Sequence, residues 1–114
     1  VIKDLKVTDC RLIDWQKLVA KKLMYPFQGA FYRELVKQNY GGDPTFEWLV
    51  YSTVDKKMAR FICSEDDLIV GEWGNSYVSG WRYALEIYAE CKDKGDYFTD
   101  FIRGNGVIKT NIYG

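Results

Sequence analysis

The sequence predicts an α+β domain in which about three helices cover a mainly antiparallel sheet of four or five strands. Three short apolar runs between residues 46 and 73, separated by two charged turns, predict a three-stranded meander at the centre of that sheet. Segments with helical periodicity flank these runs on both sides. The expected element order is β-αα-βββ-α-β, within one domain that spans residues 1–114.

An edge strand and a first helix are expected at the start of the chain. Residues 1–8 alternate weakly, with Leu5 and Val7 on one face, and lysines on such a strand protect it from pairing with another sheet. Residues 12–24 place apolar side chains at steps of three and four and lysines between them. This spacing predicts an amphipathic helix.

A second helix is expected to begin at Pro26, because proline fits the first helical turn, and to end at the Gly41-Gly42 pair. After the meander, the break at residues 74–76 precedes a third expected helix that ends near Lys92. Residues 97–103 predict a short helical turn, and residues 107–113 predict a final strand.

The meander is apolar on both sides. Phe46, Trp48 and Val50 share one face of its first strand, while Leu49 and Tyr51 share the other. Its last strand, expected over residues 68–73, is equally apolar on its two faces. A sheet with one solvated face alternates apolar and polar residues. We therefore expect either helices on both faces or another protein chain on one of them.

Composition argues against nucleic acid as the partner. The chain carries 16 basic and 16 acidic residues, and nucleic-acid binding that is independent of sequence depends on neutralising phosphates. The charges are uneven, because residues 1–40 hold eight basic against four acidic side chains and residues 41–114 hold eight against twelve. The nine Tyr, six Phe and four Trp are more than a small core easily hides, so some should reach the surface. Two explanations stay open: the aromatic residues mainly fill the core, or part of the Tyr and Trp set forms a binding surface.

The three cysteines, Cys10, Cys63 and Cys91, form no disulfide or metal-binding pattern. Cys63 and Cys91 lie among apolar residues and are expected to be small buried side chains. No signal peptide and no membrane-spanning apolar run are evident. These observations predict a cytoplasmic protein without a membrane partner.

The sequence has no histidine, which removes the usual general base and the commonest zinc ligand. It also lacks a phosphate-binding glycine loop. No catalytic residue, no metal site and no cofactor are therefore predicted. Two alternatives stay open: a hard cation at the acidic turn 64–67, and a small enzyme that uses a carboxylate or a cysteine such as Asp66, Glu86 or Cys63.

The preferred hypothesis is a non-enzymatic domain that binds another protein, as a small inhibitor or antagonist does. Examples are a phage anti-defence protein such as an anti-CRISPR, and an immunity or antitoxin protein. The expected partner is a basic or nucleic-acid-handling protein, and a homodimer through the same surface is an alternative. The candidate contacts are four aromatic residues with an acidic rim: Trp48, Tyr51, Trp73 and Tyr77, with Glu65, Asp66, Asp67 and Glu72.

The second hypothesis is a nucleic-acid-binding module. The two N-terminal helices carry basic residues with aromatic residues between them, and such surfaces stack bases and neutralise phosphates. The residues concerned are Lys17, Lys21, Lys22, Tyr25, Phe27, Tyr32, Arg33 and Lys37.

Overall fold

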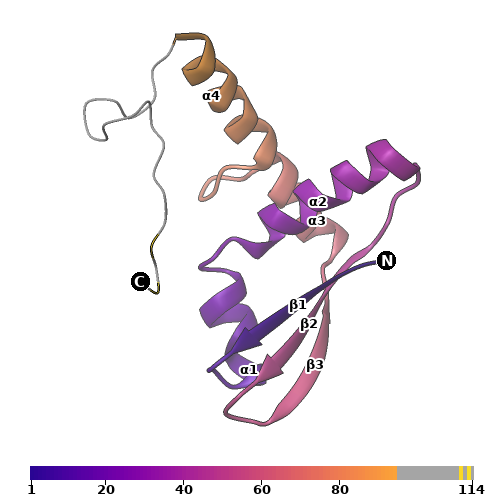
Figure 1. Ribbon diagram of the computed structural model, residues 1–114, viewed down its shortest axis with the longest axis vertical. Helices are drawn as coiled ribbons and strands as arrows, with labels where there is room; N and C mark the ends of the chain where they lie inside the picture. Colours follow the sequence, from indigo (N-terminus) through magenta and orange to yellow (C-terminus); the bar gives the residue numbers. More distant parts are fainter. Residues whose placement is uncertain (95–110, 112, 114) are drawn as a thin grey trace. The chain divides into compact units, whose positions relative to one another are not determined.

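The computed structural model describes residues 1–94, 111 and 113. Its contacts divide the chain into two compact units, residues 1–82 and 83–114. Figure 1 shows the elements, and α4 runs from the first unit into the second. The elements are β1 (Ile2–Thr8), α1 (Leu12–Trp15), the π-helical turn η1 (Gln16–Ala20), α2 (Tyr25–Tyr40), β2 (Phe46–Ser52), β3 (Lys57–Ile62), α3 (Glu65–Trp73) and α4 (Trp81–Lys94). The α+β class is therefore correct.

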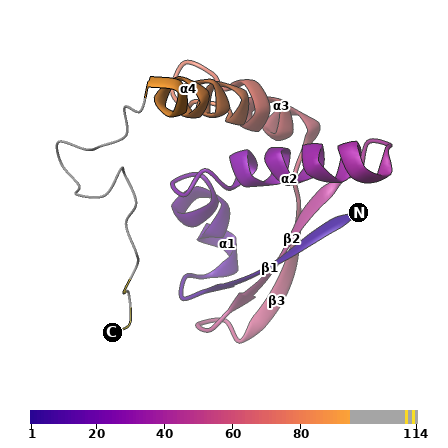
Figure 2. The ribbon, with the colours of Figure 1, turned by 45° about the horizontal axis from the view of Figure 1, so that its top comes forward.

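The sheet is smaller than expected, and it is mixed. Among the described residues it has three strands in the order β1-β2-β3, with β1 parallel to β2 and β2 antiparallel to β3. A parallel pair needs a long crossover connection, and α1, η1 and α2 supply it on one side of the sheet (Figure 2). The prediction of a mainly antiparallel sheet of four or five strands with about three helices is wrong, because the described residues form this mixed three-stranded sheet and the four helices α1 to α4.

The third strand of the predicted meander is a helix, α3. The Ser64 hydroxyl accepts a hydrogen bond from the Asp67 backbone N–H at 3.1 Å, which caps the helix. Glu65, Asp66 and Asp67 occupy the first turn, where acidic side chains are stabilised by the helix dipole. Gly74, with φ 81°, ends the helix. The stretch interpreted as an acidic hairpin turn is thus a helix start.

Several boundaries agree with the sequence and others do not. In α2, Pro26 lies in the first turn and Gly41, at φ 75°, follows the last residue, as expected. The first helix becomes a π-helical turn after Trp15. The third predicted helix, α4, begins only at Trp81. The predicted turn over 97–103 and the strand over 107–113 lie outside the described residues, except for positions 111 and 113. The single-domain expectation stays a prediction.

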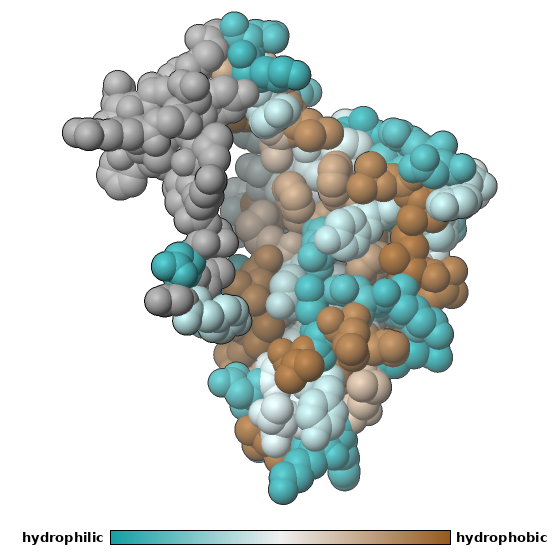
Figure 3. Space-filling model, viewed as in Figure 1, coloured by the Kyte–Doolittle hydropathy of each residue, from teal (hydrophilic) through white to brown (hydrophobic). Residues whose placement is uncertain are grey.

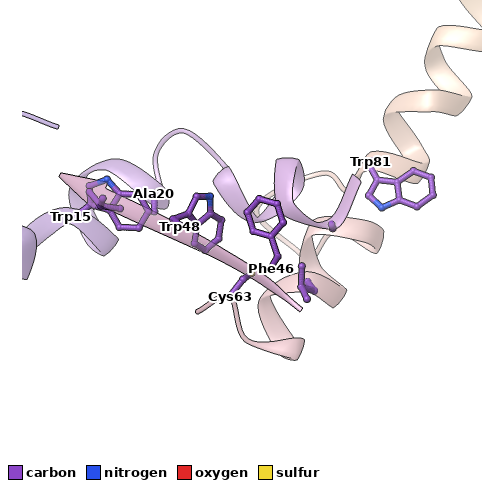
Figure 4. Packing of buried hydrophobic residues seen from close by; sticks show 9 residues of the cluster. Trp15, Ala20, Phe46, Trp48, Cys63 and Trp81 are labelled. Carbon is purple, nitrogen blue, oxygen red and sulfur yellow. The ribbon is translucent and has the colours of Figure 1, made fainter. Parts of the chain in front are cut away.

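The core lies between the sheet and the crossover helices. Phe46, Trp48 and Val50 of β2 are buried, and Figure 4 shows the rings of Trp15, Trp48 and Phe46 following one another. The ring centroids of Trp48 lie 5.8 Å from Trp15 and 5.3 Å from Phe46. We call this side of the sheet the inner face. Such rings account for much of the burial in a small domain.

The hairpin turn between β2 and β3 stabilises the first helix. Asp55 accepts a hydrogen bond from the Leu12 backbone N–H at 2.8 Å, so a carboxylate distant in sequence caps α1. The fully buried Ser52 hydroxyl donates to the Cys10 carbonyl at 2.8 Å. These bonds hold the β2–β3 hairpin against the crossover connection at one end of the sheet.

Helices α2 and α3 pack very closely. A Cβ atom on Gly71 of α3 would overlap the Pro26 carbonyl of α2, so only glycine permits this approach. The contact places α3 on α2, above the helical layer. Neither helix therefore covers the opposite face of the sheet.

Candidate functional site

The candidate site is the side of the sheet opposite the core, which we call the outer face. The strand register arranges its side chains in three rows across β1, β2 and β3. The rows are Lys3–Glu47–Ile62, Leu5–Leu49–Arg60 and Val7–Tyr51–Met58. Apolar residues occupy most positions in these rows.

The apolar side chains of the outer face are open to solvent. Leu5, Val7, Met58 and Ile62 are 63%, 68%, 55% and 61% exposed, whereas the solvated face of a sheet normally carries polar residues. In Figure 3, apolar (brown) side chains lie among hydrophilic (teal) ones over the strands in the lower half of the view. Strand spacing and rise give the whole face, its charged residues included, roughly 300 Å². This area is at the lower end of the range for the largest apolar patch on a monomeric protein.

One end of the outer face carries charged side chains from two neighbouring rows. Glu47, in the middle of the row Lys3–Glu47–Ile62, is buried although it is a carboxylate. Its oxygens lie 3.8 Å from Lys3 Nζ and 3.3 Å from Arg60 Nε, and both basic side chains are well exposed. Buried carboxylates require such partners. The cluster of Lys3, Glu47 and Arg60 has a formal charge of +1, so the outer face is apolar with a basic end.

The structure separates the residues that the sequence grouped as a binding site. Trp48 belongs to the core, because it points to the inner face. Tyr51 lies on the outer face and is partly exposed. The remaining six lie along α3 and the loop that follows it, namely Glu65, Asp66, Asp67, Glu72, Trp73 and Tyr77. The sequence missed Leu5, Val7, Met58 and Ile62 as candidate contacts, although the alternation of residues 1–8 was a signal for the first two.

The aromatic residues at the end of α3 are exposed but partly engaged. The Arg82 guanidinium lies 4.6 Å from the ring centroid of Trp73 and 4.5 Å from that of Trp81. It also donates to Glu72 at 2.6 Å. Tyr77 is almost fully exposed. Arg82 therefore fixes the position of Trp73, and the exposed rings of Trp73 and Tyr77 form a small aromatic surface at the end of α3.

The acidic residues at the start of α3 do not form a metal site. Glu65 pairs with Arg33 at 2.9 Å, while Asp66 and Asp67 are exposed. Within the part of the chain that the structure describes, no group of three acidic, cysteine or histidine side chains is placed to hold a metal ion. The acidic run has a structural explanation, since it stabilises the N-terminus of α3.

Cys63 is a poor nucleophile. Its side chain is buried, and this burial, reinforced by the negative charges of Asp67 and Glu65, raises the pKa of the thiol to about 12. At neutral pH the reactive thiolate is therefore nearly absent. The carboxylates proposed for a small enzyme, Asp66 and Glu86, belong to different units of the chain.

The basic residues of the N-terminal helices divide into two groups. Arg33 and Lys37 are neutralised in part by Asp43, at 3.8 Å and 3.1 Å, and Arg33 also pairs with Glu65. Lys17, Lys21 and Lys22 are exposed, and no carboxylate of the described residues forms an ion pair with them. Of the predicted basic surface, only Lys17 in η1 and Lys21 and Lys22 directly after it remain without an ion pair to a described carboxylate.

An open groove of about 900 Å³ lies within residues 1–82. Its lining comes from η1 and the start of α2 on one side, from α3 and the loop 75–79 on the other, and from β2 and β3 between them. Trp48, Asp67 and Tyr77 of the predicted site are among the lining residues. Volumes of this size are at the upper end for small-molecule sites.

No protein-family model matches the chain, and neither does any curated protein. In the described part of the chain, no helix is both long and apolar enough to cross a bilayer. The three cysteines are free thiols.

Proposed function

We propose that the chain is a protein-binding domain that uses the outer face of its sheet, and that it acts by covering a surface of its partner, as an inhibitor or antagonist does. The uncovered apolar rows across all three strands support this proposal most strongly. Exposing them to water is unfavourable, and burying them against a partner recovers about 25 cal/mol for each Å².

The charges of the outer face select the kind of partner. The basic end formed by Lys3 and Arg60 favours an apolar surface flanked by carboxylates. In a second copy of the chain, Glu47 is the carboxylate of the outer-face rows and already pairs with Lys3 and Arg60, so a different protein fits better. An interface of standard size buries about 800 Å² on each partner, which is more than the outer face alone offers. The contact must then extend beyond the sheet or be transient.

We also propose a cytoplasmic setting for this activity. The support is that Cys10, Cys63 and Cys91 are all free, and free thiols persist in reducing compartments.

Site-specific photo-crosslinking tests the proposed function. A benzophenone amino acid replaces Tyr51 on the outer face or, as a control, Tyr40, which is 86% exposed at the end of α2. In an extract of the native source, the Tyr51 probe should give one discrete protein adduct and the Tyr40 probe should give none.

Competition supplies the control for this experiment. An excess of unlabelled protein should abolish the adduct, and an equal excess of the Val7→Asp/Met58→Asp variant should not, because two charges are placed in an apolar row. If both probes or neither give an adduct, or if the variant competes as well as the unaltered protein, the outer face is not the binding surface.

A further inference from the structure

The groove between η1 and α3 has an apolar floor. Phe27 and Phe61 line it and are half-buried, so each leaves part of its ring at the groove surface. Trp15 and Trp48 also line the groove and are nearly fully buried, and their indole Nε1 atoms have no hydrogen-bond partner among the described residues. The floor is therefore mostly aromatic carbon, which suits an alkyl or aryl body.

One wall of the groove carries two unpaired positive charges. Lys17 and Lys21 both line it, one helical turn apart, and neither forms an ion pair with a described carboxylate. Like charges at this spacing repel each other and destabilise a helix. An anion placed between them would relieve that repulsion. The opposite wall carries Asp67, whose charge would keep an anionic group on the lysine side.

The same wall has an unusual backbone. Lys21 N–H bonds to the Gln16 carbonyl at 3.1 Å, which makes the turn π-helical. Met24 follows in a left-handed conformation with φ 55°, which is costly for a residue with a side chain. π-Helical turns and strained non-glycine residues are concentrated at binding and catalytic sites. Gln16, Lys17, Lys21 and Met24 all line the groove.

We propose that this groove binds a small amphipathic anion, with its alkyl or aryl body on the aromatic floor and its carboxylate or phosphate head group between Lys17 and Lys21. Ile62 borders both this groove and the outer face, and the other groove residues lie outside the outer-face rows. The groove therefore gives the chain a second activity that does not depend on the proposed protein partner. A ligand that fills the groove also buries the surfaces of η1 and α3 that face each other, and it should stabilise the first unit of the chain.

Calorimetric titration with three probes of equal chain length tests the head-group requirement. Laurate should bind, while dodecanol and dodecyltrimethylammonium should bind at least tenfold more weakly, because only laurate complements the two lysines. The Lys17→Gln/Lys21→Gln variant should bind laurate about tenfold more weakly than the unaltered chain. The matched control, Lys22→Gln/Lys57→Gln, removes two exposed lysines outside the groove and should bind laurate normally.

Charge reversal gives a result that loss of folding cannot imitate. The Lys17→Glu/Lys21→Glu variant should lose laurate binding and gain binding of dodecyltrimethylammonium. The proposal is overturned if the three probes bind alike, if none binds, or if the control variant loses laurate binding as well. If the protein sediments with phosphatidylglycerol vesicles but does not bind free laurate, the two lysines bind a membrane surface. This result would also overturn the proposal.

Discussion

The inner and outer faces of the sheet carry the same kinds of side chain in opposite environments. Along β2, Trp48 and Val50 are buried beneath the helices, whereas Leu49 is half-buried and Tyr51 is partly exposed on the other side. The difference comes from the topology of the chain. All the helical segments before β2 belong to the one crossover between the parallel strands β1 and β2, so they cover one face together.

This comparison teaches that hydrophobicity alone does not say which face of a strand becomes the core. A hairpin joins β2 to β3 and contributes nothing to cover the outer face, and α3 packs on α2 instead. Among residues 1–82, the outer face therefore keeps apolar side chains without an intramolecular partner. A surface of this kind is typical of interaction sites.

The largest effect that separates the two faces should come from truncating an aromatic residue on each. Trp48→Ala removes a ring packed against Trp15 and Phe46, and we expect it to lower the free energy of unfolding by about 3–5 kcal/mol. Tyr51→Ala, three residues along the same strand, should cost less than about 1 kcal/mol, because its ring is partly in solvent. Urea denaturation followed by circular dichroism measures both. Equal losses would mean that the two faces are equally buried.

A smaller effect is expected at the charged end of the outer face, formed by Lys3, Glu47 and Arg60. The Lys3→Met/Arg60→Met variant leaves the buried Glu47 without a cation, and we expect a loss of about 1–2 kcal/mol, reduced from the cost of a fully buried pair because both basic side chains are exposed. The comparison variant, Glu47→Leu, removes the charge itself and should change stability by less than about 1 kcal/mol. Chemical denaturation of the two variants checks the difference. If Glu47→Leu costs more than the double substitution, the carboxylate contributes more than its two ion pairs.

The sequence allowed part of this fold to be predicted. Strand β2, with Phe46, Trp48 and Val50 on one face, followed from period-two alternation, and the limits of α2 followed from Pro26 and the glycine at 41. These signals are local. The parallel pairing of β1 with β2 depends on contacts across more than forty residues, and no local signal specifies it.

The error at α3 has a different cause. The run from Leu68 to Trp73 is too short for its periodicity to distinguish a strand from a helix. A distinguishing signal was present before it, because Ser64 followed by Asp67 is the pattern of a helix cap. The predicted binding site rested on the expectation that Trp48 and Trp73 lie in one sheet. Because Trp73 lies in a helix, the residues of that site are far from forming one surface.

The central claim is that the side chains of the outer face are exposed to solvent while those of the inner face are buried. Measuring the accessibility of side chains on β2 and its neighbouring strands tests this claim most directly. Hydroxyl-radical footprinting with mass spectrometry measures this in the full chain at the level of single residues. We expect Leu5 and Met58 to be oxidised at rates near those of the unfolded chain, Tyr51 at a lower rate because it is only partly exposed, and Phe46 and Trp48 to be protected at least tenfold. Equal protection of both groups would show that the outer face is already covered, and would contradict the account.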